Sequence, residues 1–240
     1  MNTVHIFVQS KGGVGKTVAA TSLTEYLAEK KDNILAIDLD QSTPTFSHFG
    51  ALHVQHFDLK DENGVVDPTR FTPIANLALE HDGDVVIDIG ASTYTNFVSY
   101  LLETSLLDVF RDAGRNVLIH IPVAGGDNLQ DTANSFADLA DLDQMGQQIV
   151  VWRNGHFGKV EYKGVPLDAM PAYKANAHKI VGIIELKRLP PATLGIFTDM
   201  KMKGLTFAEA QASEDIDVMS KSGLRNARKA IFGQIEALGL

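Results

Sequence analysis

Short apolar runs, rich in β-branched residues, recur along the chain, and longer stretches of mixed character separate them. The runs cover residues 4–8, 33–38, 84–89, 116–121, 148–152 and 179–184. Strands that are apolar on both faces are typical of a parallel sheet covered by helices on both sides. The pattern therefore predicts a strand at each of these positions.

Helical composition and spacing lie between and after the strands. They predict helices over residues 17–31 and 127–142, a shorter one from about 205, and a long one over about 218–238. The alternation of strand and helix favours an α/β fold with a doubly wound, mostly parallel sheet flanked by helices.

Two intervening segments, 42–70 and 155–176, are rich in Gly, Pro, His and Asp and predict loops or short irregular helices. The chain has no repeat and no long Gly/Ser linker, and its 240 residues fit a single domain spanning 1–240.

The amino-acid composition excludes several kinds of site and argues against some kinds of partner. The chain contains no cysteine, which excludes disulfides, thiolate metal sites and iron–sulfur clusters. It has no apolar run of about 18 residues and no signal-like N-terminus, so a cytoplasmic protein is expected. The net charge of −9 argues against a globally basic nucleic-acid binder, but residues 187–240 carry 8 Lys/Arg against 6 Asp/Glu. That local excess is a weak indication of an anionic partner.

The stretch QSKGGVGKT at residues 9–17 lies between the first predicted strand and the first predicted helix. Glycines allow backbone N–H groups to converge on an anion, and the helix N-terminus adds partial positive charge. Lys16 is positioned to reach the β- and γ-phosphates, and the Thr17 hydroxyl to ligate Mg²⁺. The candidate nucleotide contacts are Gly12, Gly13, Val14, Gly15, Lys16, Thr17 and Val18.

The loop departs from the standard phosphate-binding pattern because Ser10 replaces its first glycine and Lys11 follows. With this departure, residues 11–17 match K-G-G-x-G-K-[ST], and the chain resembles the ParA/MinD family of deviant Walker A ATPases. The resemblance implies a P-loop NTPase that binds ATP with Mg²⁺ as a homodimer. It also implies that Lys11 reaches the phosphates of the partner subunit's nucleotide, so that Lys11 and Lys16 are both catalytic.

Three acidic residues follow predicted strands, at the sheet edge where open α/β folds bind ligands. Asp38 and Asp40 are spaced i, i+2, and Asp88 ends the strand at 84–89. The resemblance implies that Asp88 and Asp38 support the metal and that Asp40 orients the attacking water. Gly90 is expected to leave space for the γ-phosphate. The chain departs from the family at Gln41, where proline is common, and at Ile89-Gly90-Ala91.

The position of one asparagine indicates which nucleotide base the site binds. Asn154 lies just after the strand predicted at 148–152, within VVWRNGHFG, where the resembled family carries an asparagine that reads adenine. The chain lacks the Asn/Thr-Lys-x-Asp signature of GTP-specific relatives. ATP is therefore favoured over GTP. A loop asparagine that only shapes a turn is the alternative.

The predicted C-terminal helix has an apolar face and a basic face. Leu224, Ala227, Ile231, Ile235 and Leu238 form an apolar stripe, whereas Lys221, Arg225, Arg228 and Lys229 cluster on a neighbouring face. The cations could lie free in water, contact the DNA backbone without sequence preference, or contact lipid as in MinD-like proteins. A lipid contact would need large apolar residues up to the end of the helix, and Gly233 and Gly239 argue against it.

Beyond the nucleotide motifs, the chain is similar to plasmid conjugation and stability ATPases of the TraL/StbB type. The resemblance rests on VIDIGAST (86–93), VVWRNGHFG (150–158), residues 172–190 and LTFAEA (205–210). It implies an ATP-dependent dimerising switch with weak, partner-stimulated ATP hydrolysis, acting in plasmid partition, positioning or conjugative DNA transfer. A plasmid-encoded adaptor or DNA-binding protein is the expected partner. The alternatives are a dethiobiotin-synthetase-like ligase and a MinD-like membrane-associated ATPase.

Overall fold

The computed structural model describes residues 2–142, 146 and 148–240, and within them a seven-stranded parallel sheet forms the centre of the molecule. Its strand order is β3-β2-β4-β1-β5-β6-β9. The bounds are Thr3–Phe7 for β1, Ile34–Asp38 for β2, Gln55–His56 for β3, Asp84–Asp88 for β4, Asn116–Ala124 for β5, Ile149–Asn154 for β6 and Ile180–Leu186 for β9. Every strand expected from the apolar runs is present, which confirms the doubly wound α/β fold.

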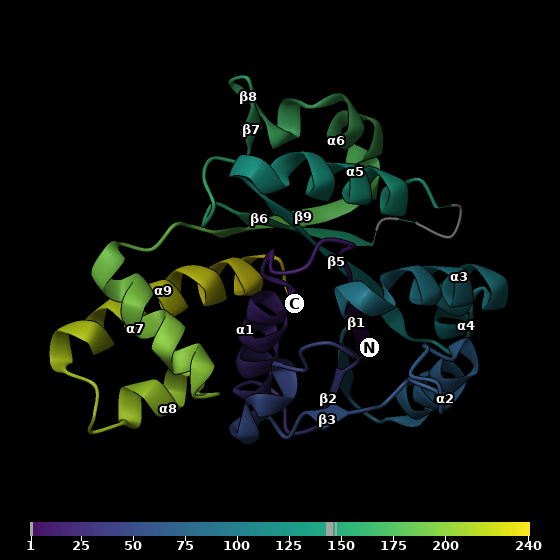
Figure 1. Cartoon of the computed structure of the whole chain (residues 1–240), viewed down its shortest axis with the longest axis horizontal. Helices are drawn as coiled ribbons and strands as arrows, with labels where there is room; N and C mark the ends of the chain where they lie inside the picture. The colour runs from purple at the N-terminus through teal and green to yellow at the C-terminus, as the bar shows by residue number, and fades with distance from the viewer. Residues whose placement is uncertain (1, 143–145, 147) are drawn as a thin grey trace.

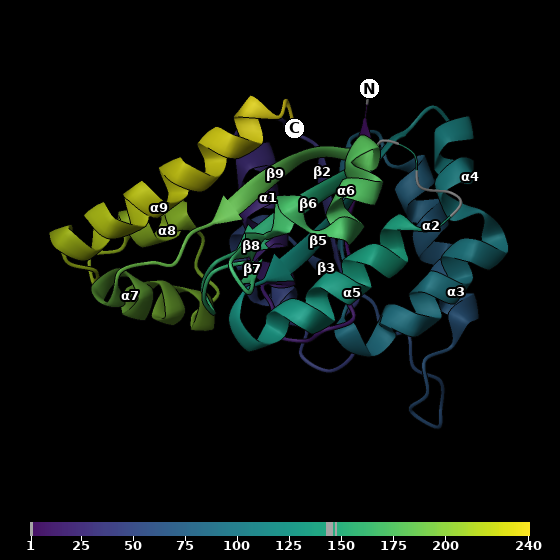
Figure 2. The ribbon, with the colours of Figure 1, turned by 90° about the horizontal axis from the view of Figure 1, so that it is seen from above.

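Helices cover both faces of this sheet (Figures 1 and 2). One face carries α1 (Lys16–Ala28), α7 (Pro191–Met202), α8 (Phe207–Ala212) and α9 (Val218–Ala237). The other carries α2 (Phe71–Glu80), α3 (Tyr94–Thr104), α4 (Leu106–Asp112), α5 (Leu129–Ala140) and α6 (Pro171–Asn176). Helices α1, α5, α8 and α9 lie where the sequence predicts them, whereas α2, α3, α4 and α7 were not anticipated.

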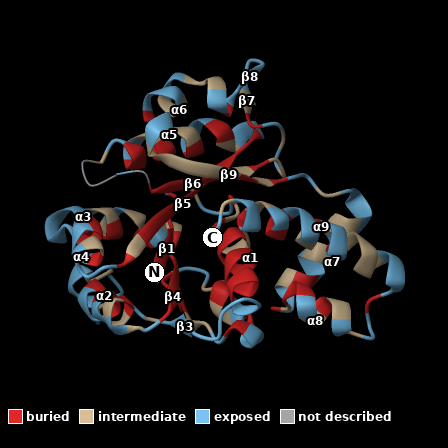
Figure 3. Ribbon diagram, turned by 180° about the vertical axis from the view of Figure 1, so that it is seen from behind, coloured by how far each residue is buried: buried red, intermediate tan, exposed pale blue. Residues whose placement is uncertain are grey.

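The strands separate two apolar cores because successive side chains point to opposite faces. In β1, Val4 and Ile6 pack with α2 to α5, whereas Phe7 packs on the α1 side. The central strands and most of α1 are buried, β9 is mostly half-buried, the edge strand β3 is exposed, and the outer sides of α7 and α9 are exposed (Figure 3). Because helices cover both faces of the sheet, the central strands are apolar on both sides and appear in the sequence as continuous apolar runs.

The segments expected to be irregular are mostly so. Residues 42–70 contain the two-residue edge strand β3, and residues 155–176 contain a small antiparallel hairpin of β7 (Glu161–Tyr162) and β8 (Val165–Pro166) before α6. Short 3-10 turns occur at Phe46–His48, Gly50–Leu52, Pro68–Arg70, Ala91–Thr93, Gly126–Asn128, Leu167–Ala169 and Ala177–Lys179.

The parallel arrangement gathers the candidate residues. Strands β1, β2, β4 and β6 all end at the same edge of the sheet, so the loop after β1, Asp38, Asp88 and Asn154 meet there. The register pairs Asp38 directly with Asp88 on neighbouring strands.

Candidate nucleotide site

The loop between β1 and α1 has the backbone geometry of an anion cradle. Gly13 and Gly15 have φ of 73° and 102°, in the left-handed region that side chains disfavour. Gly15 is also confined, since an added Cβ would lie 2.7 Å from Asn154 Nδ2. Gly15 offers no side chain to cap α1, so the N–H groups of the first helical turn remain free for an anion.

Lys16 lies inside this loop and is almost fully buried. Its Nζ donates a hydrogen bond to the Lys11 carbonyl oxygen at 3.1 Å. Burial lowers the pKa of the Lys16 ammonium, and Asp88 and Asp40 oppose this effect by favouring the charged form. The ammonium therefore lies within the loop, where a bound phosphate would need a cation.

Lys11 points to a different partner. Its Nζ lies 2.8 Å from Asp131 Oδ2 at the start of α5, and the two side chains are 43% and 55% exposed. An ion pair this exposed is weak and easily exchanged. Lys11 is therefore a cation at the surface beside the phosphate loop, held by a carboxylate of its own chain.

Thr17 and Asp88 form the inner polar contact of the site. The Thr17 hydroxyl donates to Asp88 Oδ2 at 2.7 Å, and Asp88 Oδ1 is buried without a partner among the described residues. Burial raises the pKa of Asp88 to about 7, and the Thr17 hydrogen bond and the Lys16 charge partly offset the rise. This oxygen pair fits a hydrated Mg²⁺, which prefers oxygen ligands and keeps several waters.

Asp38 and Asp40 mainly order the segment after β2. Asp38 accepts hydrogen bonds from Asp40 N (3.0 Å) and Ser47 N (2.9 Å), and burial raises its pKa. Asp40 Oδ1 accepts from Ser42 N (2.8 Å) and Thr43 N (3.1 Å). Both carboxylates thus lie beside Asp88, but each is occupied by backbone amides of its own loop.

Gly90 has a packing role that the sequence did not indicate. A Cβ at Gly90 would lie 2.6 Å from Asp40 Cα and 2.7 Å from its Cγ. The segments after β2 and β4 can touch only because residue 90 lacks a side chain. The Cβ direction of Gly90 thus points at Asp40, and the expectation that Gly90 leaves space for the γ-phosphate stays a prediction.

Asn154 is buried at the end of β6 and braces the phosphate loop. Its Nδ2 donates to the Val14 carbonyl at 2.9 Å, and its Oδ1 accepts from His156 N at 3.0 Å. The amide oxygen and one amide hydrogen are engaged in these contacts, which leaves the second hydrogen to face the adjoining cavity. This bracing role agrees with the turn-shaping alternative and leaves limited capacity for reading a base.

A cavity of about 210 Å³ adjoins the loop and Asn154. Gly13, Gly15 and Val18 line one side of it, and its apolar wall comes from Leu186, Leu189, Leu194, Phe197 and Ile231. A mostly apolar cavity with a few polar groups is typical of sites that hold a planar ring. No sequence motif marks these wall residues as a group, because they come from β9, the segment after it, α7 and α9.

Comparisons with known proteins agree with this geometry. Residues 5–212 match the CobQ/CobB/MinD/ParA nucleotide binding domain family. The chain belongs to this family. Two Escherichia coli proteins, both called Protein TraL, are 33% identical over 240 residues and 32% identical over 237 residues, covering 98–99% of this chain and 98% of each relative.

Two solved structures support the family's fold. A chain of the MinC:MinD cell division protein complex of Aquifex aeolicus aligns with a TM-score of 0.53 at 16% identity, over 96% of both chains. A ParA family ATPase from Chlorobium tepidum aligns with a TM-score of 0.55 at 14% identity, over 94% of this chain and 97% of that one. The expected ParA/MinD-type P-loop fold and the similarity to TraL-type proteins are confirmed.

Helix α9 lies beyond the residues that match the family, but the TraL proteins span it. Leu224, Ala227, Ile231 and Ile235 of the expected stripe are buried, together with Phe232, which the sequence analysis did not include. Ala227, Ala230 and Ile231 also line the cavity. The inner face of α9 therefore forms part of the nucleotide site.

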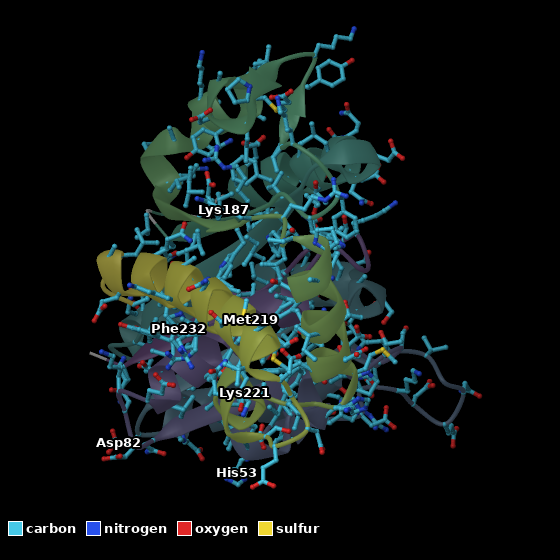
Figure 4. All side chains as sticks on the ribbon, turned by 90° about the vertical axis from the view of Figure 1, so that its left-hand side faces the viewer. His53, Asp82, Lys187, Met219, Lys221 and Phe232 are labelled. Atoms are coloured by element: carbon cyan, nitrogen blue, oxygen red, sulfur yellow. The ribbon has the colours of Figure 1, made fainter. Side chains whose placement is uncertain are left out.

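The four predicted cations of α9 differ in their surroundings. Arg228 pairs with Glu29 of α1 and lies 4.3 Å above the Phe232 ring, so it has a structural role. Arg225 is exposed and donates to Gln211 at 3.2 Å, and Lys229 is exposed. Lys221 lies near Met219 at the outer end of the helix (Figure 4). Among residues 2–142, 146 and 148–240, no helix is long and apolar enough to span a membrane.

Proposed function

We propose that this protein is an ATP-dependent dimerising switch with weak Mg²⁺-dependent ATP hydrolysis, built on a single domain. The observation that carries the proposal is Lys11, an exposed cation next to the phosphate loop whose only ionic contact, among the described residues, is the weak pair with Asp131. A cation placed at the surface can serve a second subunit, whereas Lys16 is buried and serves its own loop.

Different residues around the loop bind different parts of the nucleotide in this proposal. The loop N–H groups and Lys16 hold the phosphate chain, and the cavity beside Asn154 takes the base of ATP. Thr17 and Asp88 would hold Mg²⁺, with Asp38 behind them. When bound, Mg²⁺ supplies positive charge that neutralises the β- and γ-phosphates.

Closure of two subunits completes the site in this proposal. Lys11 leaves Asp131 and contacts the phosphates held by the partner, and Asp40 leaves its own loop amides to orient water. Because Asp40 must give up two backbone hydrogen bonds, hydrolysis by the isolated protein is slow. A protein or DNA partner that opens this loop would raise the rate.

The biological setting follows from the relatives. Similarity to TraL-type proteins along the whole chain supports a role in plasmid partition, positioning or conjugative DNA transfer, with a plasmid-encoded adaptor or DNA-binding protein as partner. The exposed cations of α9 are the surface proposed to contact DNA without sequence preference. A lipid contact is less favoured, because the apolar face of α9 is already buried.

The proposal is tested by hydrolysis assays on purified protein with ATP and Mg²⁺. We expect slow turnover that rises with DNA or a plasmid-encoded partner, and a fall of about 100-fold in Lys16→Ala. Lys30→Ala, an exposed lysine just after α1, is the matched control and should keep the wild-type rate. Turnover that requires a small organic acid would instead identify a ligase, and turnover independent of Lys16 would contradict the proposed site.

A further inference from the structure

Helix α7 forms the wall of the cavity that faces the phosphate loop. Leu194, Phe197, Thr198 and Lys201 line the cavity from this helix. Phe197 stacks on Phe207 of α8 with ring centroids 5.8 Å apart, which fixes the middle of α7. The surroundings of Lys201, one turn further on, are therefore well defined.

Lys201 is unusual among the cations of this region. It is partly buried, and among the described residues no carboxylate lies within ion-pair distance of its ammonium group. The Nζ atom lies 5.6 Å from the centroid of the Phe197 ring. Burial lowers the pKa of Lys201, and no nearby charge offsets the effect. A cation kept from water without an anion is costly, and a bound anion would remove that cost.

The position of Lys201 indicates which anion it would meet. A small recess beside α1 is lined by Lys201 together with Thr17, Val18, Thr21 and Ser22. Lys201 therefore borders both the cavity for the base and the side of α1, including Thr17 and Val18 of its first turn, where the free N–H groups face the phosphates. Between its base and its β-phosphate a nucleotide carries the ribose and the α-phosphate, and of these two only the α-phosphate is an anion.

We propose that Lys201 contacts the α-phosphate of a nucleoside di- or triphosphate held by the phosphate loop. This inference rests on the proposed function, since it requires a nucleotide at the loop. It assigns to α7 a binding role that neither the loop motif nor the strand-end acids contain.

The test compares ATP, ADP and adenosine in equilibrium binding to the full chain, for wild type and Lys201→Met. Methionine keeps the apolar stem against Phe197 and removes the charge. We expect ATP and ADP to bind about tenfold more weakly, the loss typical of one charged hydrogen bond, and adenosine to bind as before. Lys201→Arg should retain most of the wild-type affinity. Lys203→Met, an exposed lysine at the end of the same helix, should be unchanged.

Each outcome decides the matter. An equal loss for adenosine and ADP would show that Lys201 only packs, and unchanged ATP binding in Lys201→Met would overturn the inference while leaving the proposed function intact. Failure of the wild type to bind ATP would instead refute the proposed function. Because the decisive quantity is the ratio of ADP to adenosine affinity within one variant, a moderate loss of stability does not obscure it.

Discussion

Among single residues, Lys11 and Asp131 form the contact that must break in the proposed dimerisation. The pair is exposed, and exposed ion pairs contribute about 0–1 kcal/mol. Asp131 thus competes with a nucleotide on a partner subunit for the same ammonium group, but it competes weakly.

Asp131→Asn should strengthen ATP-dependent dimerisation because it removes the internal competitor for Lys11. The expected gain is up to about thirtyfold in the dimer dissociation constant, because each of the two subunits loses a competing ion pair of up to about 1 kcal/mol. Sedimentation equilibrium with a non-hydrolysable ATP analogue measures it. Asp127→Asn makes the same charge change at an exposed position nearby and should have no effect. Weaker dimers in Asp131→Asn would mean that Asp131 supports the interface.

Some residue roles were readable from the sequence and others were not. The loop glycines, Lys16 and Thr17 follow from spacing alone, because the phosphate loop is a local structure. The bracing contact of Asn154 depends on the Val14 carbonyl, 140 positions away. The packing of Gly90 against Asp40 likewise depends on the proximity of two loops that are separate in the sequence.

At the scale of elements, three strands carry a buried polar chain beneath α1. His5 of β1 and His120 of β5 share a hydrogen bond between His5 Nδ1 and His120 Nε2 at 3.0 Å. Trp152 of β6 donates from Nε1 to His120 Nδ1 at 2.9 Å. Because His120 Nδ1 accepts, its Nε2 carries the proton and donates to His5. Burial lowers the pKa of His5 to about 4 and that of His120 well below its usual value.

This histidine pair should make folding pH-dependent. The folded pKa values lie below the unfolded value of about 6.5, so the stability is fully present above that pH and is lost as the pH falls toward 4. His5 alone accounts for up to about 3 kcal/mol of the loss. In His5→Gln, the unfolding free energy from urea titrations should fall less between pH 6.5 and 4.5. The exposed His178→Gln should keep the wild-type slope, and an unchanged slope in His5→Gln would contradict the assignment.

The proposed contact between DNA and the basic face of α9 can be tested by the salt dependence of binding. Since Arg228 is committed to Glu29, three cations remain: Lys221, Arg225 and Lys229. Three phosphate contacts predict a slope of log affinity against log salt of about −2.7 on duplex DNA. The triple alanine variant should lose the slope, whereas Lys30→Ala should keep it. A slope near zero for the wild type would remove this face as a DNA contact.

The elements themselves were unequally predictable. The central strands were found because both of their faces are buried, which makes them apolar throughout, whereas the short exposed edge strand β3 has no such signal. Helix α7 was missed because its apolar residues are spread around the helix, with Leu194 and Phe197 toward the cavity and Met202 in solvent. Helices α3 and α4 were missed because Ser105, at φ 52°, divides a single apolar stretch into two short helices.

In the whole molecule, the proposed dimer interface and the cavity for the base lie on different sides of the phosphate loop. The phosphate loop, Thr17, Asp88 and the cavity lie at one sheet edge, and Lys11 lies beside them at the surface. Lys11 is tied to α5, whereas the base cavity is walled by α7 and α9. A second subunit that engages Lys11 would therefore approach from the α5 side of the loop and leave α7 and α9 accessible to DNA or a partner.

The most direct test is the molar mass in solution, measured by light scattering with Mg²⁺ and a non-hydrolysable ATP analogue. The account predicts a shift of the 26.1 kDa chain to twice its mass on adding the analogue. Lys11→Ala should bind the analogue with unchanged affinity and remain a monomer. A wild-type protein that stays monomeric at saturating analogue, or a Lys11→Ala variant that dimerises as well as wild type, would contradict the central claim.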